Sequence, residues 1–319
     1  MRMRPIYDPV CLAHDTGAHP ECAARLSGAG FDEETVPGGE DDITLVHTPE
    51  HVRRVREACR GGAVLDPDTV ASPGSWEAAV RAVGATLKAA AEGGFAITRP
   101  PGHHAAAGRA SGFCLFNNIA IAARKLANAG KRVLVFDFDG HRGDGTSEIF
   151  AEDDAVLYWS IHQYPAYPGG GGETEIGLGR GKGYTVNVPL PPGSGDDLFL
   201  QGIRHSLPVA RAFAPDVVAV SAGFDAHRLD PLLDLQVTTN SFHEVGRMLA
   251  GEFDEVFATL EGGYHPGALR DSIDAFLAGF NGTPWESPEK ATDSSIKLHD
   301  EFDMRLCHLE ECLAPHWSF

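Results

Sequence analysis

Two aspartates and a histidine alternate directly after an apolar run of the sequence. Asp137, Asp139 and His141 follow residues 132–136, which read Arg-Val-Leu-Val-Phe. Side chains of an extended chain alternate between two sides, so these three point the same way if strand geometry persists that far. Carboxylate oxygen and imidazole nitrogen suit a divalent ion such as zinc. We therefore predict a catalytic metal site at the end of a buried strand; the alternative is that the acids only cap the next helix.

Reactive side chains also follow four other short apolar runs, which we interpret as buried parallel strands. These runs lie at residues 94–98, 155–159, 216–220 and 255–260. Helical periodicity separates the strands at residues 75–91, 117–129, 197–212 and 241–250. The alternation predicts an α/β fold, a doubly wound parallel sheet with helices on both faces. Ligands of such sheets bind outside the carboxyl ends of the strands, so we expect one site there.

The length and composition favour one catalytic domain. A chain of 319 residues, 43% of them hydrophobic, can bury a large core, and we predict a single domain over residues 1–319. Residues 285–319 form a polar C-terminal extension with weak helical periodicity at 301–313 and no readable role. Six scattered cysteines indicate free thiols, and the sequence contains no apolar run of membrane-spanning length. We expect a cytoplasmic protein with no membrane partner.

Charge and glycine content exclude two classes of ligand. The formal net charge is −19, whereas surfaces that bind nucleic-acid phosphates are usually basic, so we expect no direct nucleic-acid binding. Such acidity suits a cationic substrate, although solubility is the stronger explanation. The glycine-rich stretches at 169–172 and 177–183 do not follow a strand and open a helix, as a nucleotide-binding loop must. We interpret both as ordinary loops.

Seven short motifs occur in a fixed order along the chain. They lie at residues 14–21, 68–75, 99–104, 112–114, 137–146, 221–227 and 260–264. Together they resemble the zinc-dependent deacetylases of the histone deacetylase and acetylpolyamine amidohydrolase superfamily, especially its class II-like and bacterial members. The resemblance covers residues from about 6 to 280 and implies the arginase/deacetylase fold. Each motif alone is a weak signal, but seven in the family's order leave little room for chance.

The resemblance implies a set of metal ions. A catalytic Zn²⁺ would be held by Asp139, His141 and Asp225, with the fourth position open for water and the substrate carbonyl. Members of the superfamily also carry structural monovalent cations, K⁺ or Na⁺, at two places. The residues matching the first place are Asp137, Asp139, His141, Ser160 and Ile161, and those near the second are Phe150, Asp153, Val156 and Tyr184.

The resemblance also implies the catalytic roles. His103 and His104 would lie beside the attacking water, and His104 would act as general base and then general acid. Asp137 would orient His103 and Asp144 would orient His104, each carboxylate fixing one imidazole tautomer. Tyr264 would donate its phenolic hydrogen to the developing oxyanion.

Four further residues are predicted to bind the substrate. Gly112 and Phe113, with Tyr167, match the walls of the acyl-lysine tunnel in the family; ordinary core packing is the alternative for the aromatic rings. Asp68 lies near the position of a rim acid that holds the substrate backbone. An equally plausible interpretation makes Asp68 the N-cap of the helix that begins near Ser75.

The motif around the metal ligands departs from the family at two positions. Arg142 replaces a second histidine, and Gly140 is unusually small. A permanently charged arginine either changes the packing of the loop behind the metal or binds a carboxylate. The segment between Leu26 and Val46 is also shorter than in the family. The substrate preference of family members therefore does not carry over to this chain.

Several functions fit these motifs. The first is a zinc-dependent deacylase acting on acetyl-lysine in a peptide or protein. The second is an amidohydrolase of acetylpolyamines or other small acylated amines, but the chain lacks the insertion between Pro73 and Arg99 that narrows the entrance of such enzymes. An inactive acyl-lysine-binding module is a remote alternative because no catalytic residue is missing. An arginase-like enzyme with two manganese ions needs an Asp-x-Asp pair that residues 224–227 do not contain.

Overall fold

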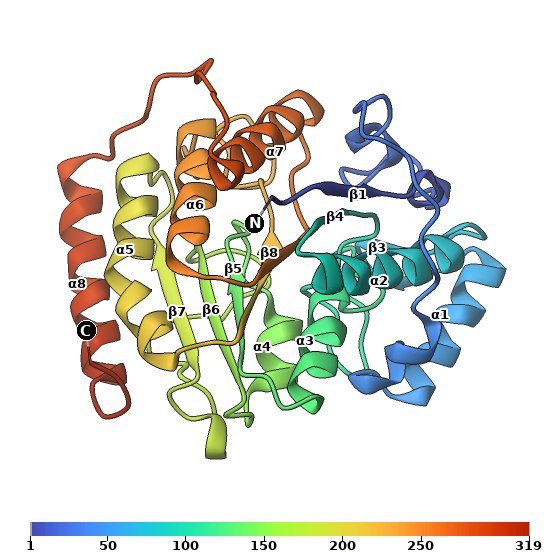
Figure 1. The fold of residues 1–319 in the computed structure, drawn as a ribbon, viewed down its shortest axis with the longest axis horizontal. Helices are drawn as coiled ribbons and strands as arrows, with labels where there is room; N and C mark the ends of the chain where they lie inside the picture. Colours follow the sequence, from blue (N-terminus) through green and yellow to red (C-terminus); the bar gives the residue numbers. More distant parts are fainter. Residues whose placement is uncertain (1, 319) are drawn as a thin grey trace.

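Seven strands form one parallel sheet at the centre of the protein (Figure 1). The structure is a computed structural model that describes residues 2–318. Every pair of neighbouring strands in this sheet is parallel. In spatial order the strands are β1 (Pro5–Tyr7), β4 (Phe95–Ile97), β9 (Val256–Leu260), β8 (Val217–Ala222), β5 (Val133–Asp137), β6 (Val156–Gln163) and β7 (Thr185–Leu190). A small hairpin of β2 (Val64–Asp66) and β3 (Thr69–Val70) lies outside the sheet.

Helices cover both faces of the sheet (Figure 1). Those whose apolar side chains join the core on one face are α5 (Asp196–Phe213), α6 (Thr239–Glu252), α7 (Pro266–Asn281) and α8 (Ile296–Leu313). The other face carries α2 (Ser75–Glu92), α3 (Asn118–Asn128) and α4 (Asp144–Phe150), with α1 (Pro49–Gly61) packed outside α2. Short 3₁₀ helices lie at Pro9–Ala13, Ala23–Arg25, Glu40–Leu45 and Gly179–Gly181. The predicted doubly wound α/β fold is confirmed.

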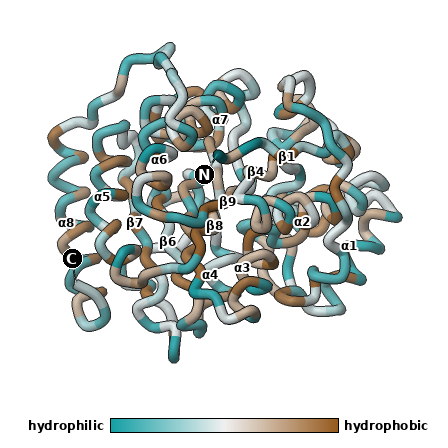
Figure 2. The backbone as a smooth tube through the Cα atoms, in the orientation of Figure 1, coloured by the Kyte–Doolittle hydropathy of each residue, from teal (hydrophilic) through white to brown (hydrophobic). Residues whose placement is uncertain are grey.

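Strand β5 is buried on both faces, which explains why its residues Val133 to Phe136 are all apolar. Leu134 and Phe136 join the core beneath α5 to α8, whereas Val133 and Val135 join the core beneath α2 to α4. A strand covered on both faces must be hydrophobic at every position. Full burial of each such side chain stabilises the fold by about 1.5–3 kcal/mol. Figure 2 shows hydrophobic residues along the central strands and hydrophilic ones on the outer turns of the helices.

All five predicted strands are present, and the four predicted helices match α2, α3, α5 and α6 within a few residues. Two sheet strands were missed. β7 contains Asn187 and Pro189, which break an apolar pattern, and a proline is tolerated there because β7 is an edge strand. β1 has only three residues and gives no periodicity. The helical signal at 301–313 is confirmed as part of the longer helix α8.

The order of the strands brings distant residues together. From β5 the chain moves outward to β6 and β7, then returns through α5 to β8 on the opposite side of β5. The register places Asp137 at the end of β5 beside Ser160 on β6 and Ser221 on β8. Loops that leave neighbouring strands in opposite directions open a crevice, and α/β proteins bind ligands at such points.

The C-terminal extension packs on the edge of the sheet. Helix α8 contacts β7 and α5, and its buried side chains include Phe302, Leu306 and Leu309. The Trp317 indole donates a hydrogen bond to the Gly183 carbonyl at 2.6 Å. Within residues 2–318, no helix combines the length and apolarity needed to cross a membrane, and all six cysteines are free.

Candidate active site

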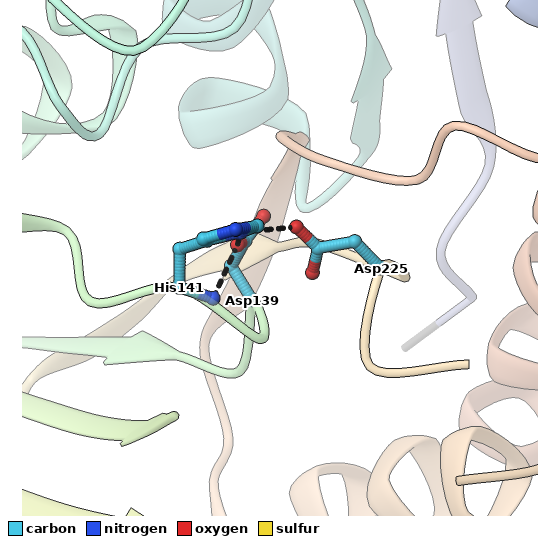
Figure 3. Close-up of side chains that lie close together, drawn as sticks. All are labelled: Asp139, His141 and Asp225. Carbon is cyan, nitrogen blue, oxygen red and sulfur yellow. Dashed lines mark hydrogen bonds and ion pairs between the residues drawn. The ribbon is translucent and has the colours of Figure 1, made fainter. Parts of the chain in front are cut away.

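Asp139, His141 and Asp225 converge on one point at the carboxyl end of the sheet (Figure 3). Their candidate ligand atoms lie within 4.8 Å of one another, and all three residues are buried. His141 Nδ1 lies 2.6 Å from Asp225 Oδ2 and 3.3 Å from Asp139 Oδ1. Asp225 follows β8, so the adjacency of β5 and β8 assembles the cluster.

The local backbone differs from the extended geometry considered for this run. Strand β5 ends at Asp137, and the chain then turns, because the Asp139 N–H donates to Asp137 Oδ1 at 3.2 Å and the His141 N–H donates to Asp139 Oδ1 at 2.8 Å. Aspartate side chains favour such turns by bonding the backbone two residues ahead. Asp137 therefore contacts His103, while Asp139 and His141 contact Asp225.

The cluster fits a divalent cation. Backbone N–H groups hold both carboxylates: Gly140 donates to Asp225 Oδ1 at 2.7 Å, and Gly262 donates to Asp139 Oδ2 at 2.8 Å beside the His141 N–H on Asp139 Oδ1. Asp139 Oδ1 and Asp225 Oδ2 face His141 Nδ1. These two oxygens and one nitrogen form a donor set suited to zinc. Burial opposes protonation of His141, but Asp225 and Asp139 outweigh it and raise its pKa to about 10. The site thus attracts positive charge.

His103 and His104 stand side by side with ring centroids 4.0 Å apart, and each meets one of the predicted aspartates. His103 Nδ1 lies 3.1 Å from Asp137 Oδ2, which also accepts a hydrogen bond from the Tyr158 hydroxyl at 2.9 Å. Burial lowers the pKa of His103, but Asp139 and Asp137 outweigh it and hold that pKa well above its usual value.

His104 forms the second pair. Its Nδ1 lies 2.7 Å from Oδ1 of Asp144, the first residue of α4, and Arg109 donates to Asp144 Oδ2 at 3.1 Å. Burial and the neighbouring His103 lower the pKa of His104 to about 4. The ring is therefore neutral at pH 7, and a hydrogen on Nδ1 leaves Nε2 as the basic nitrogen.

A pocket of about 210 Å³ contains all four predicted substrate-binding residues. It is lined by Asp68, His104, Gly112, Phe113, His141, Tyr167, Leu232 and Tyr264. Asp68 lies in the β2–β3 turn and is exposed, so it is at the pocket and not at a helix cap. Helix α2 begins at Ser75 after Gly74, which makes no side-chain cap. The N-cap interpretation of Asp68 was wrong.

The aromatic walls of this pocket depend on strained backbone. Phe113 has a φ of 71°, rare for a side chain of this size, and its N–H donates to the buried Thr69 hydroxyl at 3.1 Å. Gly112 has a φ of 54°, and a Cβ there would lie 2.4 Å from His104 Cδ2. Glycine is required because the backbone passes directly against the His104 ring. Tyr167 contacts the same ring from another side at a centroid distance of 5.2 Å.

Tyr264 is held by residues that sequence reasoning missed. Its backbone N–H donates to Asp230 Oδ2 at 2.6 Å, and the Arg25 guanidinium lies 4.9 Å from its ring centroid. Arg25 also donates to the carbonyls of Gly263 and Glu261, both at 2.6 Å. Burial raises the pKa of Tyr264 well above its usual value, so the phenol stays protonated.

Glu261 is another residue without an assigned role in the sequence. Its Oε2 accepts hydrogen bonds from the N–H groups of Gly102 and His103, at 2.6 and 3.1 Å, and Ser221 donates to its Oε1 at 3.1 Å. It therefore fixes the backbone of the histidine pair. Its position directly after the fifth apolar run was the available signal. Arg25 and Asp230 gave none, because each acts on a residue far away in the sequence.

Arg142, the departure from the family motif, binds a carboxylate. Its Nη2 lies 2.7 Å from Glu175 Oε2, while Glu175 Oε1 accepts the Gly171 N–H at 2.8 Å. The arginine thus ties the glycine-rich loop to the metal-binding segment. A Cβ at Gly140 would lie 2.4 Å from Leu233 Cδ1, 3.0 Å from Asp225 Oδ1 and 3.1 Å from the Ala226 backbone nitrogen, so a larger residue would crowd the metal ligand.

Comparison with known proteins identifies the family. The model for the histone deacetylase domain matches residues 18–280. The chain belongs to the histone deacetylase family. It is 40% identical over 296 residues to a probable deacetylase of Archaeoglobus fulgidus, covering 84% of this chain and 82% of that protein. As a family member, the protein is an amidohydrolase of the deacetylase type, which decides against the arginase-like alternative.

Solved structures of this family share the fold over most of the chain. The HDA15 HD domain superposes with a TM-score of 0.89 at 33% identity, covering 99% of this chain and 97% of that one. The acetylpolyamine aminohydrolase of Burkholderia pseudomallei gives a TM-score of 0.79 at 32% identity, covering 87% and 98%. The family match ends at residue 280, before the C-terminal extension.

Proposed function

We propose that this deacetylase-family enzyme hydrolyses the amide of acetyl-lysine in a peptide or protein. The observation that carries the proposal is the convergence of a buried Asp-His-Asp cluster, the His104–Asp144 pair and Tyr264 on one pocket with aromatic walls. A narrow apolar pocket accepts a thin alkyl chain, and the reactive groups lie where its terminal amide would arrive. The shape and the chemistry therefore point to the same class of substrate.

Asp139, His141 and Asp225 would hold the catalytic ion, for which Zn²⁺ is the best match to the donor set. When bound, this ion supplies a Lewis acid that polarises the amide carbonyl and acidifies a water molecule. We also propose structural K⁺ or Na⁺ ions near Ser160 and Tyr184, by resemblance to the superfamily.

His104 moves the proton in the proposed reaction. Its neutral ring takes a proton from the attacking water at Nε2, and Asp144 stabilises the imidazolium that forms. The same proton then passes to the amine nitrogen as the carbon–nitrogen bond breaks. His103, held by Asp137, acts as a fixed hydrogen-bonding neighbour.

Tyr264 stabilises the negative charge that develops on the carbonyl oxygen. Its phenol keeps its hydrogen because burial raises the pKa, so it can donate to the oxyanion. Phe113 meets the Tyr264 ring edge-on at a centroid distance of 5.6 Å. Together with Tyr167, Phe113 would enclose the alkyl chain and exclude water from the reacting bond.

A small acylated amine is the second candidate substrate. Asp68 lies at the pocket and offers a carboxylate either to a peptide N–H or to the second cationic nitrogen of an acylpolyamine. Structural likeness to an acetylpolyamine aminohydrolase supports this alternative. The segment between Pro73 and Arg99 favours the peptide, because it holds only α2 and β4 with short connections.

One experiment separates these functions. An acetyl-lysine peptide, acetylputrescine and acetylspermidine are each incubated with the enzyme, and the zinc content is measured on the same sample. We expect peptide hydrolysis, its loss in His104→Ala and unchanged zinc in that variant. Turnover of the polyamines alone would reassign the substrate. Zinc binding without any turnover would point to another amide as substrate, and the absence of both zinc and turnover would favour the binding-module alternative.

A further inference from the structure

Residues 285–295 cross the end of the molecule that carries the active site, and α8 then runs along α5 and β7 toward the opposite end. Figure 1 shows this segment leaving α7, passing over the ends of α6 and α5, and returning beside α5 as helix α8. Residues at the starts of α5 and α6 form hydrogen bonds with this segment. Thr292 donates to Asp196 Oδ2 through its N–H and hydroxyl at 2.8 and 3.1 Å, and the Ser294 N–H donates to Asp197 Oδ2 at 2.8 Å. The segment is thus fastened and not a loose tail.

Glu289 in this segment holds the loop that follows β8. Its carboxylate accepts hydrogen bonds from His227 Nε2 at 3.0 Å, Arg228 Nε at 2.8 Å and the Thr239 N–H at 3.0 Å. The side chain of Glu289 is only 10% exposed. Burial opposes ionisation, but these three partners outweigh it and hold the pKa of Glu289 at about 2. An ionised, largely buried carboxylate therefore joins the extension to this loop.

A chain of hydrogen bonds connects Glu289 to the pocket. The Leu229 N–H donates to His227 Nδ1 at 3.1 Å, which leaves the imidazole hydrogen on Nε2 for Glu289. The Asp230 N–H donates to the His227 carbonyl at 2.7 Å and closes the turn. The Asp230 carboxylate in turn accepts hydrogen bonds from the backbone N–H groups of Tyr264, at 2.6 Å, and of the pocket residue Leu232, at 3.1 Å. Glu289 is thus linked to the proposed oxyanion donor through one turn of chain.

Arg305 on helix α8 binds the start of the loop that carries the pocket residue Tyr167. Its Nη1 donates to the carbonyls of Tyr164 and Pro189, at 3.0 and 3.2 Å, and its guanidinium lies 5.4 Å from the Tyr164 ring centroid. Tyr164 begins the loop that carries Tyr167 three residues later. That loop continues into glycines with positive φ at 169–171.

We propose that the C-terminal segment 285–319 positions both walls of the substrate pocket, through Glu289 on the side of Tyr264 and Leu232 and through Arg305 on the side of Tyr167. This inference rests on the proposed deacylase function for its kinetic consequences. Glu289 and Arg305 are positioning residues, since neither is among the residues that line the pocket. The two contacts come from different parts of the segment and act on different loops, so they are separable.

Single substitutions in the full-length protein test each contact. Glu289→Gln keeps the shape of the side chain but removes the charge, and we expect kcat to fall by about tenfold to a hundredfold with a smaller change in KM, since Tyr264 acts in the transition state. Arg305→Met should mainly raise KM, by about tenfold, because Tyr167 contacts the alkyl chain before and during reaction. Arg305→Lys should recover part of the loss, since it restores one donor.

Hydrogen exchange of the backbone amides gives a second readout that needs no substrate. Exchange should accelerate at residues 227–232 in Glu289→Gln and at residues 164–172 in Arg305→Met, each without change in the other loop. If the protein hydrolyses no acylated amine at all, the proposed function is refuted. The hydrogen-exchange result would still decide whether Glu289 and Arg305 position the two loops. Zinc content, measured on each sample, separates loop displacement from loss of metal.

Matched controls exclude a general loss of stability. Glu286→Gln removes the same charge three residues away at an exposed site, and Met304→Gln changes the exposed neighbour of Arg305; neither should alter kinetics or exchange. Leu313→Ala removes buried volume from the far end of α8 and should lower Tm while leaving kcat and KM unchanged. The proposal is overturned if Glu289→Gln and Arg305→Met behave as wild type in kinetics and exchange, or if Leu313→Ala reproduces both effects.

Discussion

Gly112 lies against the His104 ring, and replacing it by alanine should disable the proposed general base. A Cβ at this position would lie 2.4, 2.7 and 2.9 Å from Cδ2, Cγ and Cβ of His104. Ordinary carbon contacts are about 3.5–4.0 Å, so the ring or the loop must move by about 1 Å. Such a shift breaks the 2.7 Å contact between His104 and Asp144. A misplacement of about 1 Å costs roughly a hundredfold in rate, which is the loss of kcat that we expect.

The same substitution also strains the backbone. Gly112 has a φ of 54°, and a side chain in that region costs about 1–2 kcal/mol, so Gly112→Ala should lower Tm by a few degrees. The assay is steady-state hydrolysis of an acetyl-lysine peptide, with zinc content and Tm measured in parallel. Gly108→Ala is the matched control, because Gly108 belongs to the same segment and a Cβ there meets no atom within 4 Å. A Gly112→Ala enzyme with wild-type kcat would refute the close-approach argument.

Three other predictions concern the metal, the oxyanion and pH. Tyr264→Phe should lower kcat by roughly a hundredfold, the effect of one lost oxyanion donor, and unchanged turnover would exclude the role. Asp225→Ala should lose both zinc and activity, measured by metal analysis and hydrolysis, and a full zinc equivalent would contradict the ligand set. Burial opposes ionisation of Glu21, but Arg99 outweighs it and holds its pKa at about 2. A depressed pKa stabilises the fold above the unfolded value near 4.5, and this stability is lost as pH falls from there to about 2. Glu21→Gln should flatten this decline in urea unfolding between pH 5 and 2, and an unchanged slope would exclude Glu21 as its source.

The strands and the motifs at their ends were predictable because their signals are local. An apolar run such as residues 133–136 identifies a buried strand whatever lies around it. The polar residues that follow each run are conspicuous because they end a hydrophobic stretch. Two strands of the sheet without a local signal were missed: β7 carries Asn187 and Pro189, and β1 has three residues. Their places in the sheet depend on partners elsewhere in the chain.

Within the site, local spacing placed Asp139 and His141 together, while the membership of Asp225 rested on the family resemblance. The structure supplies the physical reason, since 84 residues separate Asp225 from His141 and only the neighbouring positions of β5 and β8 bring their atoms to 2.6 Å. The sequence equally left Asp68 open between a helix cap and the pocket. The turn between β2 and β3 decided for the pocket.

The sequence by itself determined the fold class and the donor types of the metal cluster, because these follow from spacing over a few residues, and its seven motifs carried the resemblance to the family. Tertiary structure alone decided what holds the site in place. Arg25 packs on the ring of Tyr264, and Asp230 accepts a hydrogen bond from its backbone N–H. Arg142 forms an ion pair with Glu175, and Glu289 binds His227 in the loop after β8. Hydrogen bonds and ion pairs between distant segments leave no periodic pattern in a sequence, since a single charged residue looks the same whether it faces solvent or a buried partner.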